Sequence, residues 1–201
     1  MSKKTASEEK LDPRVKRTRA LIEQAFMALL AEKGFSSITV QDITQRAEVN
    51  RATFYAHFAD KSALLEAAIQ HAFRLELEKR TLNACHFSEA NLRALVVTVC
   101  EFISQSDAHC KTCDSQFETL VEKEVRRQIQ ELVELWLEQI GSEIDLKTAA
   151  TAASWTIYGL ALQWSREKGK PRPKAEQFAE QILPLVAVYF KPREVSKTAQ
   201  G

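Results

Sequence analysis

The segment 38–61 constrains the fold more than any other part of the sequence, because two short helical patterns follow one another in it across a two-residue break. Thr39 is a suitable N-cap for the first pattern, since its hydroxyl can accept a backbone N–H of the first turn. Asp42 stands three residues later and can reach back to complete a weak capping box. A short helix is therefore predicted to begin directly after Thr39.

The second pattern begins at Asn50, another residue that caps helices well. Phe54 and Phe58 follow at i, i+4 spacing, so they share one face and can anchor this helix in a core. Two short helices joined by a tight break predict a helix-turn-helix. The spacing indicates that the two phenylalanines are core residues and not residues that stack on bases.

Similar patterns fill the rest of the chain, which has only 5 Gly and 5 Pro among its 201 residues. This composition favours helix and argues against a sandwich or a barrel. The fold class is predicted to be all-α, with a three-helix N-terminal domain and a helical C-terminal domain. The predicted helices span 13–33, 39–47, 51–58, 61–83, 89–105, 114–140, 146–168 and 174–190, the last one bent at Pro184.

A helix-turn-helix places its second helix in the major groove of DNA, with its first residues nearest the bases. Arg51 can pair with guanine or a phosphate, and Ala52 is small enough for close approach. Tyr55 offers a hydroxyl to a phosphate, although it could also be a half-buried core residue. The predicted DNA-contacting residues are Thr39, Gln41, Asn50, Arg51, Ala52, Thr53, Tyr55, His57 and Lys61.

Residues 34–65 resemble the signature of the TetR/AcrR family. The distinctive parts are the pair Phe54-Tyr55, the pair His57-Phe58, and Lys61 with the leucines that follow it. The resemblance covers about the first third of the chain. Many members have glycine at the positions of Glu48 and Ala52, so this sequence departs from the family there.

The resemblance implies a repressor-like regulator that binds a pseudo-palindromic operator as a homodimer and leaves it when a small effector binds. It also implies an arm and DNA-binding domain in residues 1–60 and a helical effector-binding and dimerisation domain in residues 61–201. The charges permit this, because the first 61 residues carry a small excess of basic side chains and the remainder a small excess of acidic ones. A purely helical binding module without DNA contact is the main alternative.

Large aromatic side chains of the C-terminal part predict an apolar pocket for an apolar or aromatic effector, although each alone is more often plain packing. The candidates are Phe102, Phe117, Trp136, Trp155 and Tyr158. Small residues and an apolar stripe on the last two helices predict the dimer interface, the alternative being packing within one protomer. The candidates are Ala153, Phe178, Ile182, Leu185 and Tyr189.

Cys110 and Cys113 form a lone C-x-x-C, with Cys85-His86 as further candidate ligands. A structural zinc site usually needs two such pairs, so free thiols are expected, with no metal and no cofactor. The sequence contains none of the nucleophile, phosphate-loop or zinc-protease motifs, and an enzyme is not expected. The polar N-terminus does not resemble a signal peptide, which predicts a cytoplasmic protein.

Overall fold

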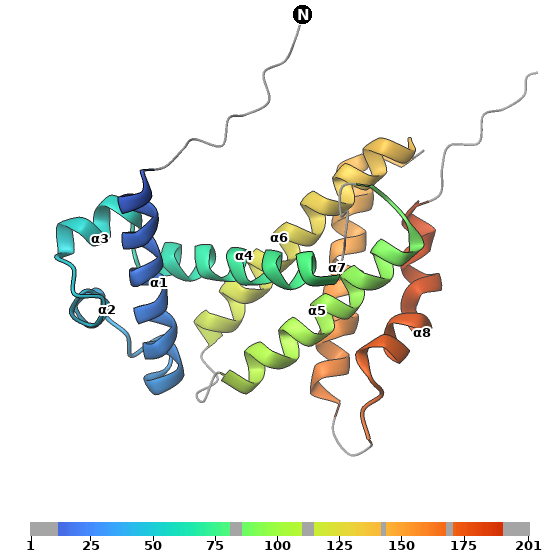
Figure 1. The fold of residues 1–201 in the computed structure, drawn as a ribbon. Coiled ribbons are helices and arrows are strands. Elements are labelled where there is room, and N and C mark those ends of the chain that lie inside the picture. Colours follow the sequence, from blue (N-terminus) through green and yellow to red (C-terminus); the bar gives the residue numbers. More distant parts are fainter. Residues whose placement is uncertain (1–11, 81–85, 110–114, 142–143, 168–170, 191–201) are drawn as a thin grey trace, which may run out of the picture. The chain divides into compact units, whose positions relative to one another are not determined.

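The computed structural model describes residues 12–80, 86–109, 115–141, 144–167 and 171–190. These residues form eight α-helices and one short 3-10 helix, which confirms the all-α class (Figure 1). The helices are α1 Pro13–Lys33, α2 Val40–Arg46, α3 Arg51–His57, α4 Lys61–Arg80, α5 Glu89–His109, α6 Ser115–Ile140, α7 Leu146–Arg166, α8 Ala175–Ala187 and η1 Val188–Phe190. None of the helices described here is both long and apolar enough to cross a membrane.

The chain divides into two compact units, residues 1–64 and 65–201. The division falls inside α4, one turn after the expected division at residue 60. Leu64, in the first turn of α4, is fully buried and belongs to the N-terminal unit. Burial of this leucine stabilises the packing of the first turn of α4 in the core of that unit.

In the first unit, α1 packs against α2, and α2 packs against α3. The predicted caps of α1 are present: the Asp12 carboxylate accepts the Arg14 backbone N–H at 2.9 Å, and Gly34 ends the helix at φ 74°. Gly34 has no Cβ, so it adopts this left-handed backbone without steric cost. Behind it, the rings of Phe26 and Phe35 meet edge to face, 6.3 Å apart, in the core.

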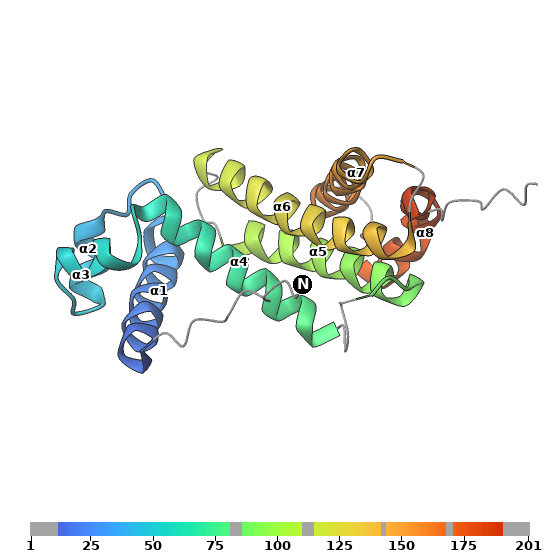
Figure 2. The same cartoon turned by 90° about the horizontal axis from the view of Figure 1, so that it is seen from above.

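In the second unit, α7 packs against α5, α6 and α8, and α8 also packs along α5 (Figure 2). Asp145 caps α7 by accepting the Thr148 N–H at 2.9 Å, as its sequence position predicts. The ring of Trp136 is fully buried and lies 6.1 Å from both Phe87 and Phe190. This aromatic cluster joins η1 to α6.

Two helix ends differ from the prediction. The helix α5 continues to His109, whereas a loop was expected from Ser106. The Ser106 hydroxyl donates to the Phe102 carbonyl at 2.9 Å, so this serine is accommodated within the helix. The last helix ends as α-helix at Ala187, shortly after Pro184, and tightens into η1. Cys85, Cys110 and Cys113, named above as free thiols or metal ligands, lie outside the described residues.

Candidate nucleic-acid interface

The first helix of the motif, α2, begins with the predicted capping box, and a neighbouring lysine strengthens it. Thr39 accepts the Asp42 N–H at 3.1 Å, and the Asp42 carboxylate accepts the Thr39 N–H at 2.8 Å and its hydroxyl at 2.6 Å. The Lys33 ammonium lies 2.9 Å from the same carboxylate. The Thr39 hydroxyl, followed by the Lys33 ammonium, holds the pKa of Asp42 well below its ordinary value.

The break between α2 and α3 is made by Glu48, whose φ is 54°. The Val49 N–H donates to the Thr44 carbonyl at 3.0 Å across this residue. Helices commonly end with a residue in the left-handed conformation that such a backbone bond spans, and this residue is usually glycine. The structure therefore explains why glycine suits this position, and it shows that this chain has a residue with a Cβ there.

Replacing Glu48 with glycine should stabilise the first unit, because glycine adopts φ 54° without the clash that a Cβ causes. The gain should be about 1 kcal/mol, reduced by the greater freedom of glycine in the unfolded chain. Urea unfolding followed by circular dichroism measures it. Glu48→Ala removes the same charge but keeps the Cβ, so it should give no gain. Equal stabilisation by both variants would contradict this explanation.

The second helix of the motif, α3, is capped by Asn50, whose side-chain oxygen accepts the Thr53 N–H at 2.7 Å and the Thr53 hydroxyl at 2.9 Å. Phe54 is fully buried, and its ring lies 6.0 Å from that of Phe58 and 5.4 Å from that of Tyr55. The inward face of α3 is thus anchored by phenylalanines, as their spacing predicts.

The outward face of α3 consists of Arg51, Ala52, Tyr55 and Ala56, which are all exposed and adjacent on the helix surface. Tyr55 keeps 51% of its surface exposed, so it is not a core tyrosine. His57 is half-buried. Ala56 is absent from the sequence-based set, although its i+4 spacing from Ala52 indicates the same face. The face has one cation, one hydroxyl and two small residues.

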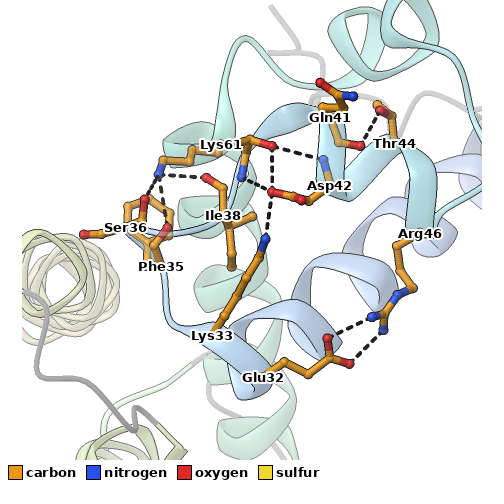
Figure 3. Close-up of polar contacts among 11 residues, drawn as sticks. Glu32, Lys33, Phe35, Ser36, Ile38, Gln41, Asp42, Thr44, Arg46 and Lys61 are labelled. Carbon is orange, nitrogen blue, oxygen red and sulfur yellow. Dashed lines mark hydrogen bonds and ion pairs between the residues drawn. The ribbon is translucent and has the colours of Figure 1, made fainter.

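The Lys61 side chain does not extend away from the unit, as a phosphate contact would require. Its ammonium donates to the carbonyl oxygens of Phe35 at 3.1 Å, Ser36 at 3.3 Å and Ile38 at 3.0 Å (Figure 3). An ammonium has three N–H donors, and these three bonds use all of them. Lys61 is therefore engaged inside the N-terminal unit, where the sequence predicted a contact to DNA.

Two arginines of this unit are also held by neighbours. Arg46 makes two bonds to the Glu32 carboxylate, at 3.0 and 2.8 Å, joining α2 to α1 (Figure 3). Arg19 lies 4.7 Å above the Phe58 ring and pairs with Glu23 at 3.0 Å. Planar guanidinium groups suit both arrangements. These cations fix α1 against the motif.

The profile of "Bacterial regulatory proteins, tetR family" matches residues 21–68, the segment that contains α2, α3 and the start of α4. Residues 21–68 are therefore a TetR-type N-terminal segment. The curated proteins that match this part of the chain are named as HTH-type transcriptional regulators. The helix-turn-helix and the helical second unit are the two parts of the TetR fold.

Curated relatives match only part of this chain. The uncharacterized HTH-type regulator YxbF of Bacillus subtilis is 46% identical over 66 residues, covering 32% of this chain and 17% of YxbF. An uncharacterized HTH-type regulator of Haemophilus influenzae is 27% identical over 128 residues, covering 59% of this chain and 62% of that protein. The chain thus spans less than two thirds of the length of either relative.

Solved structures of transcription regulators and of RolR match nearly the whole chain, at identities that show the fold alone. A regulator from Streptomyces coelicolor has a TM-score of 0.64 at 18% identity, covering 90% of this chain and 98% of that one. FadR of Bacillus subtilis with stearoyl-CoA has a TM-score of 0.54 at 15% identity, with coverages of 83% and 96%. RolR with resorcinol has a TM-score of 0.51 at 17% identity, with coverages of 91% and 98%.

The five aromatic residues expected around an effector make different contacts in the described part of the chain. Trp136 is in the core cluster described above, and the Phe102 ring packs edge-on against Phe73 at 5.4 Å. Trp155 is 51% exposed beneath the Arg126 guanidinium, which lies 3.5 Å from the ring centroid. Packing thus gives Trp136, Phe102 and Trp155 different neighbours, and a common effector lining stays a prediction.

Phe117 and Tyr158 of that set line one cavity among the described residues. It lies between α5, α6 and α7, and its volume of about 20 Å³ is enough for roughly one water molecule. Arg166 and Glu118 also border it. Phe117 and Tyr158 are thus the two predicted lining residues that the fold brings together.

The predicted dimer residues also separate into buried and exposed groups. Ala153 and Ile182 are buried within the protomer, so they are not available to a partner surface. Phe178 stacks on Trp164 in the same protomer, at 6.1 Å. Only Leu185 is fully available, with 58% of its surface exposed. This separation arises because α8 packs on α5 and α7.

Tyr189 places the outer surfaces of α7 and η1 side by side, because its hydroxyl lies 3.0 Å from that of Thr156. Next to these two residues stand Trp155 on α7 and Val188 on η1, which are 51% and 46% exposed. Trp155, Leu185 and Val188 are the large apolar side chains that α7, α8 and η1 leave exposed, and we call this set the α7–α8 face. Trp155 and Val188 are absent from the sequence-based set of interface residues, although exposed large apolar side chains are a signal for interfaces.

Proposed function

We propose that this protein is a helix-turn-helix transcription regulator that binds duplex DNA with the outward face of α3. The observation that carries the proposal is the exposed group of Arg51, Ala52, Tyr55 and Ala56, held in place by the buried ring of Phe54. A rigid helix with small residues between a cation and a hydroxyl can approach base edges closely. Binding would occupy an operator and repress transcription. A protein with this role would act in the cytoplasm.

Arg51→Gln and Tyr55→Phe should each lower the affinity for DNA about tenfold, because each removes a polar contact to a base or phosphate. The duplex used is one that the wild-type protein selects from a random-sequence pool, and fluorescence anisotropy measures the affinity. Both variants should keep the wild-type melting temperature, since the two side chains are exposed.

A matched control carries the arginine change elsewhere. Arg74→Gln alters an arginine of α4 whose side chain is 63% exposed. It should bind the duplex as the wild type does. Wild-type affinity in the Arg51 and Tyr55 variants would rule out the outward face of α3 as the DNA-binding surface.

We infer that the regulator acts as a homodimer joined through the α7–α8 face. One helix-turn-helix reads a half-site, and a two-fold dimer reads a pseudo-palindrome. A second copy of the chain is the occupant that this role requires. The exposed apolar side chains of Trp155, Leu185 and Val188 support it, since a surface that remains in water rarely collects three of them.

We further propose a small apolar or aromatic effector that binds between α5, α6 and α7, beside Phe117 and Tyr158. The cavity there must widen to admit it, so the effector would favour a different packing of the second unit. Proteins of similar fold were solved with resorcinol and with stearoyl-CoA, which supports ligand binding in this architecture. A compound that releases the wild type from DNA, but not Tyr158→Ala, would locate the site.

A further inference from the structure

Lys61 occupies a position that ordinarily disfavours a positive charge. It is the first residue of α4, where the helix dipole is positive and acidic residues are preferred. Its ammonium avoids that end by folding back onto the carbonyl oxygens of Phe35, Ser36 and Ile38. The same ammonium lies 4.5 Å from the centre of the Phe35 ring, which adds an attraction to its π face.

The three carbonyl groups belong to the segment 35–38, which links the end of α1 to the N-cap of α2. The segment contains one internal backbone bond, from the Ile38 N–H to the Phe35 carbonyl at 3.1 Å, and the side chains of both residues are buried. A short linker outside a helix leaves its carbonyls in need of donors. Lys61 supplies them from 23 to 26 residues away in the sequence.

These bonds close a ring of elements around the DNA-reading helix. The chain runs from the segment 35–38 through α2 and α3 to Asp60, which caps α4 by accepting the Ala63 N–H at 2.8 Å. Lys61 then returns to the segment where the ring began. Figure 3 shows the ammonium between these carbonyls and the capping box of α2 beside them. The segment before α2 is therefore joined to the start of α4 after α3, and this limits how far α2 and α3 can move.

We propose that Lys61 is a positioning residue for the outward face of α3, which acts through the segment 35–38 and does not contact a phosphate. The inference rests on the proposed DNA-binding function and adds a residue that determines its specificity. A side chain that holds the reading helix in register affects the contacts to base edges most, because these depend on geometry. Contacts to phosphates tolerate small shifts and carry no sequence information.

The variant Lys61→Met tests this, since methionine keeps the apolar stem and removes the charge and all three donors. Its affinity is measured for the selected duplex and for a random-sequence duplex, over a range of salt, at a temperature where circular dichroism shows the variant folded. We expect an unchanged salt slope on the random duplex. The ratio of selected to random affinity should fall about tenfold.

A phosphate contact predicts the opposite pattern. The salt slope would fall by about 0.9 for one lost contact, and the affinity ratio would stay as in the wild type. Either that pattern or no change in slope and ratio would overturn the proposal. Lys147→Met, which removes an exposed lysine of α7, controls for the change in net charge and should leave both quantities unaltered.

Hydrogen exchange separates this inference from the proposed function. In Lys61→Met, the backbone amides of residues 38–42 should exchange at least about tenfold faster, while those in the middle of α1 keep the wild-type rate. Unchanged exchange at 38–42 would refute the positioning role of Lys61 even if the protein binds DNA. If exchange there is faster in the variant but the wild-type protein binds neither duplex, the DNA-binding function is refuted and the contact of Lys61 with the segment 35–38 still stands.

Discussion

Replacing Leu185 with glutamate is expected to convert the proposed dimer into monomers and to lower the affinity for a duplex with two half-sites at least about 100-fold. A two-fold interface contains each residue twice, so the change places two carboxylates in an apolar contact. A loss of about 2.8 kcal/mol corresponds to this factor. The fold should survive, because the Leu185 side chain is 58% exposed in the protomer.

Sedimentation equilibrium at micromolar concentration measures the first effect, and anisotropy with the two-half-site duplex measures the second. Leu135→Glu is the matched control, since that leucine of α6 is 41% exposed and lies outside the α7–α8 face. It should remain dimeric. Ile182→Glu is unsuitable as a test because Ile182 is buried and its replacement should disrupt the protomer. A monomeric wild type, or a dimeric Leu185→Glu, would refute this interface.

Replacing Phe54 with alanine should unfold the first unit and abolish DNA binding while the second unit stays folded. Phe54 is fully buried between the rings of Tyr55 and Phe58, and truncating such a side chain costs about 3–5 kcal/mol. A core built from only 64 residues has a comparable total stability. The second unit has its own core around Trp136, so it should stay folded when the first unit unfolds.

Circular dichroism should show a partial loss of helix, and limited proteolysis should cut within residues 12–64 and spare the remainder. Tyr55→Phe is the control, because it changes the adjacent exposed residue without opening a cavity. It should melt and resist protease as the wild type does. A Phe54→Ala protein that keeps the full helical signal would show that the ring contributes little to this core.

The helix starts could be predicted from the sequence because a cap acts within one turn. Thr39, Asn50 and Asp145 each accept a backbone N–H three residues ahead, as expected from residue type and spacing alone. The core role of Phe54 followed in the same way from its i+4 partner. Such interactions span four residues or fewer, so the local sequence contains both partners.

The roles of the exposed and half-exposed residues depended on partners far along the chain, and only the tertiary structure decided them. The Lys61 ammonium binds carbonyls more than twenty residues earlier, which no local pattern encodes. Ile182 and Leu185 belong to one apolar stripe, but one is buried and the other exposed, because the packing of α8 on α5 and α7 covers part of the stripe only. Periodicity identifies an apolar face, whereas the position of neighbouring helices determines how much of that face a partner can reach.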